Sequence, residues 1–410
     1  MGYIDYTIQK ITLVLDQIER LSHSEFPHSD PEQALRLLKK LFEDDLERIN
    51  KALGGGDEKV KVSSCAQASL HVALYLPILG FCLRATNVRN SFELFIPLLK
   101  LCHQLLKPTT KLILSSEWNF SPFTYPLIFP ELPDFVLIGL PASEAGNALV
   151  VPLAGHELGH SVWRSYGVDT RIKASLQAKV IAELKQHWAD FELQYQTKPD
   201  ITKIETDLFV RSIWSAALEL SLRQAEELFC DSLAVRIFGE SYFHAVEYLI
   251  SPHFGNRRAT HYPDIKTRTT AMMRAADTFG VPHIPNFSDR FTEAQPNIDP
   301  KQKLILMLSD AATIQAIADL IAVVEAIANQ CTLPLPNSGS ADAIYKCFKS
   351  GVPAKNLVNL ADVISAGWKA YFDKDLWKSN STALERFGPL NELIFKTVEV
   401  MEFEIRLRAP

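Results

Sequence analysis

The stretch GHELGH at residues 155–160 carries the most specific pattern in this sequence. Side chains four residues apart lie on one face of a helix, so His156 and His160 can bind one Zn²⁺ there. Glu157 is rotated by about 100° from His156 and can serve as the general base for an attacking water. With 11 histidines in 410 residues, a chance match is expected roughly 0.02 times. The small and apolar residues 150–154 place this helix in the interior.

A catalytic zinc usually binds three protein side chains, so a third ligand must come from outside this helix. A metzincin would supply a histidine six residues after His160 and a glycine three residues after it, but Tyr166 and Trp163 stand there. A carboxylate on a second helix is the remaining common arrangement. The sequence offers three candidates: Glu183, Glu226 and Glu227.

Glu227 is the preferred third ligand because of the residue one helical turn later. Asp231 follows it by four residues, so both carboxylates project from one helix face. A ligating histidine normally donates its second N–H to a carboxylate, which fixes its tautomer. Glu183 lacks a carboxylate in that position, whereas the small residues Cys230 and Ala234 let the Glu227 helix pack closely. We therefore expect one Zn²⁺ per chain, bound by His156, His160 and Glu227, with Asp231 accepting a hydrogen bond from a histidine.

The composition of the chain excludes several classes of protein. The chain is 47% hydrophobic with a formal net charge of −6, as in ordinary globular proteins. Lys and Arg number 42 against 48 Asp and Glu, which argues against binding to nucleic acid. The six cysteines show no Cys-x-x-Cys spacing, and the N-terminus has no signal-peptide pattern. We expect no transmembrane segment and a cytoplasmic location.

Hydrophobic periodicity predicts an α+β, predominantly α fold. Short apolar runs bounded by prolines, at 111–114, 123–129 and 135–140, predict a small sheet. Helices are expected near 171–195 and near 202–238, the second ending at Gly239. The expected parts are a helical region at 1–108, a zincin-like catalytic domain at 109–280, a proline-rich linker at 281–300 and a helical region at 301–410.

The order of these motifs resembles the gluzincin peptidases typified by the CAAX prenyl endopeptidases and the bacterial heat-shock membrane proteases. In these peptidases a His-Glu-x-x-His helix, here residues 156–160, precedes a Glu-x-x-x-Asp helix, here Glu227 to Asp231. Residues 125–129 and 135–139 are similar to the hairpin whose edge strand binds substrate in that family. Residues 260–263 with Arg268 resemble its Thr/Ser-His-Pro…Arg segment. The likeness covers roughly residues 115–275, and the typical members have transmembrane helices.

The resemblance implies a zinc-dependent metallopeptidase, here soluble, acting on a peptide or protein substrate as an endopeptidase. Glu157 would be the general base. Because Tyr262 stands between His261 and Pro263, either His261 or Tyr262 would stabilise the oxyanion. Arg268 would connect its loop to the active-site helices. Two alternatives stay open: a zincin-fold binding or regulatory module that keeps metal without turnover, and a zinc hydrolase of a non-peptide amide. The intact Glu157 argues against the first.

Overall fold

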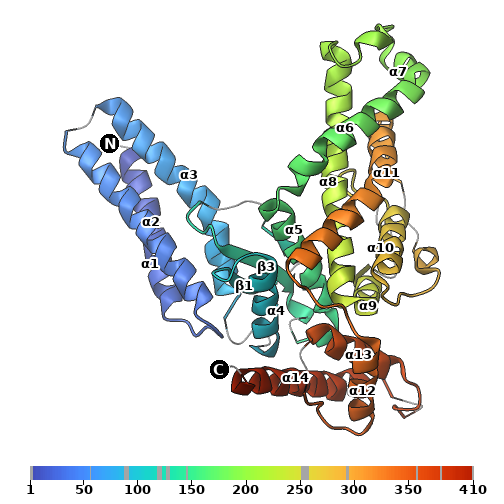
Figure 1. Cartoon of the computed structure of the whole chain (residues 1–410). Coiled ribbons are helices and arrows are strands. Elements are labelled where there is room, and N and C mark those ends of the chain that lie inside the picture. Colours follow the sequence, from blue (N-terminus) through green and yellow to red (C-terminus); the bar gives the residue numbers. More distant parts are fainter. Residues whose placement is uncertain are drawn as a thin grey trace. The chain divides into compact units, whose positions relative to one another are not determined.

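The computed structural model describes residues 3–55, 57–86, 92–117, 122–125, 130–144, 146–250, 258–291, 295–356, 359–378 and 381–408. Over these ranges the chain is predominantly helical with a small three-stranded sheet (Figure 1), which confirms the expected α+β, mostly α class. Two compact units are present. The first comprises Met1–His103 with Lys107–Gly146, and the second comprises Gln104–Leu106 with Asn147–Pro410. The boundary at residues 146–147 differs from the one expected near residue 108.

The first unit is built on amphipathic helices. They are α1 (Tyr3–Ser22), α2 (Asp30–Leu53), α3 (Glu58–Leu83) and α4 (Phe92–Leu105). Apolar residues three or four positions apart bury one face of α1, as Ile11, Val14 and Ile18 do against the α2 residues Leu38 and Phe42. The helical character expected for this region therefore follows from its apolar periodicity.

The sheet of the first unit has the strand order β1-β3-β2, formed by β1 (Lys111–Glu117), β2 (Phe123–Thr124) and β3 (Phe135–Pro141). β1 runs parallel to β3, and β2 runs antiparallel to it with Thr124 opposite Ile138. The strands expected at 111–114 and 135–140 are confirmed. Of the strand expected at 123–129, the structure shows β2, and residues 126–129 lie outside the described residues.

The second unit is arranged around the long helix α8 (Leu208–Phe238), which packs against α5 (Pro152–Ser165), α6 (Val168–Gln186), α10 (Ile265–Phe279) and α11 (Pro300–Gln330) (Figure 1). The other helices are α7 (Trp188–Tyr195), α9 (Glu240–Ile250), α12 (Ser338–Lys349), α13 (Leu360–Phe372) and α14 (Ala383–Arg408). Short 3₁₀ helices cover Ala142–Glu144 (in the first unit), Ala148–Val150, Ile201–Lys203 and Phe287–Arg290.

Two segments of the second unit differ from expectation. The helix expected over 171–195 is broken at His187, whose φ of −101° and ψ of 28° separate α6 from α7. The segment expected as a linker at 281–300 packs on the unit where it is described, because Phe287 is fully buried with its ring 5.0 Å from that of Phe243. By contrast, α8 ends at Gly239 as expected, with a positive φ of 57°.

Two helices among the described residues, α3 and α11, are long and apolar enough to cross a membrane. Length and composition are the only grounds for this, and the core helix of a globular protein meets the same criteria. Half of the most apolar window of α11 and a third of that of α3 are buried inside the structure. These helices therefore give no clear transmembrane segment.

Two glycines bring α5 and α8 close together. A Cβ atom at Gly159 would lie 2.9 Å from the Cα, Cβ and Sγ atoms of Cys230. One at Gly155 would lie 2.8 Å from the ring of Phe238 and 3.8 Å from the Cα of Ala234. Since later residues of α8 meet earlier residues of α5, the two helices run antiparallel. The motif helix can approach α8 this closely only because both positions lack a side chain.

We expect Gly159→Ala to destabilise the protein by about 1–3 kcal/mol, because the added methyl group must displace α8 backbone. Urea unfolding followed by circular dichroism measures this. Gly388→Ala is the matched control: it lies inside α14 with no heavy atom within 4 Å of the added Cβ. That substitution should stabilise by about 0.5–1 kcal/mol. Equal stability of Gly159→Ala and the unaltered protein would contradict the close packing.

Candidate metal centre

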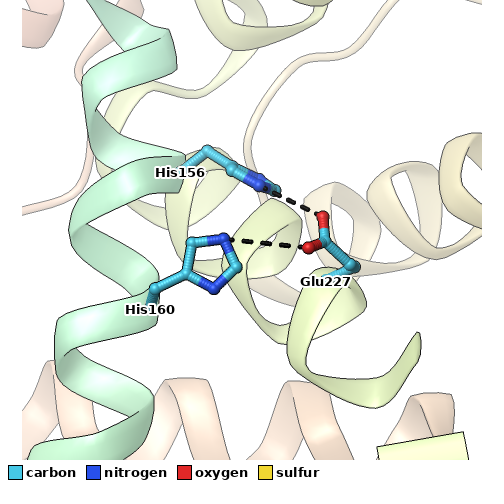
Figure 2. A group of neighbouring side chains, drawn as sticks. All are labelled: His156, His160 and Glu227. Atoms are coloured by element: carbon cyan, nitrogen blue, oxygen red, sulfur yellow. Dashed lines mark ion pairs between the residues drawn. The ribbon is translucent and has the colours of Figure 1, made fainter. Parts of the chain in front are cut away.

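Three side chains from α5 and α8 converge at the crossing of these helices. The ligand atoms of His156, His160 and Glu227 lie within 4.8 Å of one another. Glu227 Oε2 is 3.4 Å from His156 Nε2, and its Oε1 is 3.8 Å from His160 Nε2 (Figure 2). These are the residues expected from the sequence to bind metal. The group could hold a metal ion, and its imidazole and carboxylate donors suit zinc.

Each histidine of the group is oriented by a second carboxylate on α8. His156 Nδ1 lies 2.9 Å from Asp231 Oδ1, and His160 Nδ1 lies 2.8 Å from Glu226 Oε1. Because an ionised carboxylate can only accept, both Nδ1 atoms donate. In the neutral form of each imidazole the lone pair is then on Nε2, which faces Glu227. This tautomer is the one that two metal-binding histidines need.

Asp231 is the most enclosed carboxylate of the centre. Its side chain is fully buried and accepts hydrogen bonds from Tyr242 Oη at 2.6 Å and from Arg268 Nε and Nη2, each at 2.8 Å. Burial alone would raise the pKa of Asp231, but the charge of Arg268 and the contact with His156 hold it well below its usual range. Asp231 therefore stays ionised and attaches α10 to the histidine. Arg268 connects these elements as expected.

The local charge favours a cation. Burial alone would lower the pKa of His156, but Asp231 and Glu227 raise it to about 10. Burial would raise the pKa of Glu227, and its contact with His156 lowers it instead. Glu226, Glu227 and Asp231 thus surround two imidazoles, and Arg268 approaches this group with its Nη2 atom 3.9 Å from Glu227. A divalent cation would complete the charge balance.

Glu157 lies on α5 beside the ligands and is not one of them. It is 6% exposed. Burial raises its pKa, an effect that His156 and His160 oppose and Glu227 reinforces. A carboxylate with a raised pKa next to a metal-binding group is suited to accept a proton.

The two other carboxylates considered as third ligand have different partners. Glu183 is buried between α6 and α11, where Gln315 Nε2 donates to its Oε1 at 2.6 Å. It does not belong to the ligand group, so the alternative that made it a ligand is wrong for this structure. Glu226 lies at the centre but contacts His160 through Nδ1. Its position is that of an orienting carboxylate.

His261 and Tyr262 lie together on an exposed turn before α10. The Tyr262 backbone N–H donates to Ala259 O at 3.0 Å, and the ring centroids of His261 and Tyr262 are 4.5 Å apart. Burial raises the pKa of Tyr262, and the negative charges of Glu227 and Glu157 contribute. His261 and Tyr262 thus both lie on the turn that precedes α10, the helix of Arg268.

Comparisons of the chain with protein-family models, with curated proteins and with solved structures found no match.

The sequence pattern misses two partners of this centre. It treats Glu226 only as a competing ligand, and it does not single out Tyr242. The antiparallel register supplies the signal for Glu226: if Gly159 meets Cys230, then His156 faces Asp231 and His160 faces the Glu226–Glu227 pair. Tyr242 lies on α9, beyond the Gly239 turn, so only the tertiary structure places it.

We expect zinc to bind stoichiometrically to the unaltered protein and to be lost in Glu227→Ala, because that change removes one of three donors. Elemental analysis of protein purified without added metal measures it. Glu183→Gln is the control: it alters a buried carboxylate of similar environment on α6 and should keep its zinc. Zinc retained by Glu227→Ala and lost from Glu183→Gln would show that the third ligand is on α6.

We expect Asp231→Asn and Glu226→Gln to weaken zinc binding by roughly 10–100-fold without abolishing it, because each changes the partner of a histidine and not a donor. Asp231→Asn should have the larger effect, since Asp231 is also bonded to Tyr242 and Arg268. Titration against a competing chelator gives both affinities. Unchanged affinity in both variants would exclude an orienting role for these carboxylates.

Proposed function

We propose that this protein is a zinc-dependent metallopeptidase, an endopeptidase of the gluzincin type. The observation that carries the proposal is the convergence of His156, His160 and Glu227 with the buried carboxylate of Glu157 on the same helix. A structural zinc site is normally closed by four protein ligands, whereas a catalytic site uses three. This group offers three, with a base beside them.

His156, His160 and Glu227 would hold one Zn²⁺, and the Nδ1 contacts with Asp231 and Glu226 would leave both Nε2 atoms free to bind it. When bound, Zn²⁺ supplies Lewis acidity, which polarises a carbonyl group and makes water more acidic. Asp231 and Glu226 increase the basicity of the two histidines. This division of roles accounts for every carboxylate that α8 brings to the centre.

Glu157 performs the proton transfers in the proposed reaction. Its carboxylate takes a proton from the water that attacks the scissile carbonyl, and the carboxylic acid so formed gives that proton to the leaving amine. His261 or Tyr262 donates a hydrogen bond to the oxyanion that develops on the carbonyl. Both are on the exposed turn before α10, where a substrate can reach them.

Peptides or proteins are the proposed substrates, and the proposed location is the cytoplasm. The six cysteines, at 65, 82, 102, 230, 331 and 347, are free thiols, which fits a reducing compartment. A metal-holding module without turnover is the alternative from a different class, and a hydrolase of non-peptide amides is the alternative within the enzyme class. The buried Glu157 favours turnover over the first.

We expect Glu157→Gln to keep zinc and fold but to lose hydrolysis, because the amide preserves size and removes the base. The assay is mass spectrometry of a mixed peptide library incubated with zinc-loaded protein, with and without chelator. Asp190→Asn, on exposed α7, is the control and should cleave as the unaltered protein does. Equal cleavage by Glu157→Gln would overturn the assignment of the base. Absence of chelator-sensitive cleavage by the unaltered protein would favour the non-catalytic module.

A further inference from the structure

A buried ion pair lies outside the metal centre and bonds to the turn that carries His261 and Tyr262. Arg258 is 4% exposed, and its guanidinium donates two hydrogen bonds to Asp310 of α11, from Nη1 to Oδ2 at 2.7 Å and from Nη2 to Oδ1 at 2.5 Å. Its Nε–H donates to the backbone carbonyl of Tyr262 at 3.0 Å. One planar side chain thus joins a helix of the unit to the turn.

Asp310 is itself joined to α8, the helix of the third ligand. Gln224 Nε2 donates to Asp310 Oδ1 at 2.9 Å, and Gln224 is fully buried. Gln224, Glu227 and Asp231 are three and four residues apart along α8 and so share a face. The Arg258–Asp310 pair is therefore attached to the same side of α8 that presents Glu227 to the histidines.

The turn is fixed at its other end as well. Asp264 caps α10 by accepting from the Thr267 backbone N–H at 3.0 Å, and Arg268 of the same helix binds Asp231. Residues 259–263 therefore lie between two arginines, each paired with a buried or partly buried aspartate. An exposed turn usually has freedom to move. Here its Tyr262 carbonyl is held by Arg258, which pairs with Asp310 of α11, and the helix that follows it is bonded to the centre through Arg268.

We propose that Arg258 is a positioning residue for Tyr262. By pairing with Asp310 while donating to the Tyr262 carbonyl, it fixes the turn so that the Tyr262 phenol can donate to the oxyanion. This inference rests on the proposed peptidase function and takes Tyr262, whose backbone carbonyl Arg258 binds, as the oxyanion donor. Burying the charged guanidinium of Arg258 costs desolvation free energy. Precise placement of a reacting group can offset that cost in function, since a misplacement of about 1 Å can reduce a rate by about 100-fold.

The kinetic test compares Arg258→Lys, Tyr262→Phe and the double variant. Lysine keeps the charge but cannot bond Asp310 twice and Tyr262 O at once. We expect kcat to fall about 10-fold or more in Arg258→Lys with KM little changed, and roughly 100-fold in Tyr262→Phe. In the Tyr262→Phe background, Arg258→Lys should cost nothing further. Equal losses in both backgrounds would overturn the inference, because Arg258 would then act independently of Tyr262.

A spectroscopic readout separates this inference from the proposed activity. In protein labelled with 3-fluorotyrosine, the ¹⁹F resonance missing from Tyr262→Phe identifies Tyr262 among the 11 tyrosines. We expect Zn²⁺ alone to shift it, and Arg258→Lys to move or broaden it without weakening zinc affinity. The control Arg290→Lys, which alters an exposed arginine paired with Glu247, should leave it unchanged. A resonance unaffected by Arg258→Lys would overturn the positioning role, even in a protein that cleaves peptides.

Asp310→Asn is the second variant, in case Arg258→Lys does not fold. It keeps the shape of the pair and removes its charge, so the Tyr262 resonance should again move while zinc affinity stays. If the unaltered protein cleaves no peptide but the resonance responds to both changes, the proposed activity fails and the positioning of Tyr262 by Arg258 stands. An unaltered resonance in Asp310→Asn would count against the ion pair.

Discussion

The close antiparallel packing of α5 on α8 is the contact on which the rest of the centre depends. Its closest point is Gly159 against Cys230, where the absence of a Cβ lets the two backbones meet. At this separation a histidine can reach a glutamate, and its opposite nitrogen can reach another carboxylate on the same helix. A wider crossing would leave the imidazoles of His156 and His160 facing water. The small residues of the motif are thus as necessary to the site as its donors.

This packing also forces charges into the interior. Asp231 is fully buried, Glu227 lies beside it, and Arg268 is the basic side chain bonded to Asp231. Buried ion pairs of this kind rarely add net stability, since desolvation offsets their attraction. An apolar contact between α5, α8 and α10 would hold the helices at least as well. The cluster is better explained by the metal ion that His156, His160 and Glu227 could hold than by a contribution to folding.

The residues of the metal centre could be predicted from the sequence where helical periodicity determines which side chains share a face. The i, i+4 spacings place His156 with His160 and Glu227 with Asp231, and most of the helices follow from their apolar stripes. What the sequence could not predict requires tertiary distances: Tyr242 against Asp231, or Arg258 against Asp310 across 52 residues. The break at His187 was also missed, because the apolar pattern continues through it. Side chains that act through another residue leave no periodic signal.

The helices after residue 300 form hydrogen bonds with the segments that flank the metal centre. At the start of α5, Trp368 of α13 donates its Nε1–H to Leu149 O at 3.1 Å, and Asn391 of α14 accepts from the Ala148 N–H at 2.9 Å. At the turn before α10, Asp310 of α11 binds Arg258. The segment leading into the histidine helix and the turn carrying Tyr262 are thus both bonded to the last third of the chain. A small zincin-like core without these helices would lose the Asp310 carboxylate that pairs with the buried guanidinium of Arg258. Within this unit these helices therefore support the segment that precedes α5 and the arginine that holds the turn before α10, whereas the donors themselves come from α5 and α8.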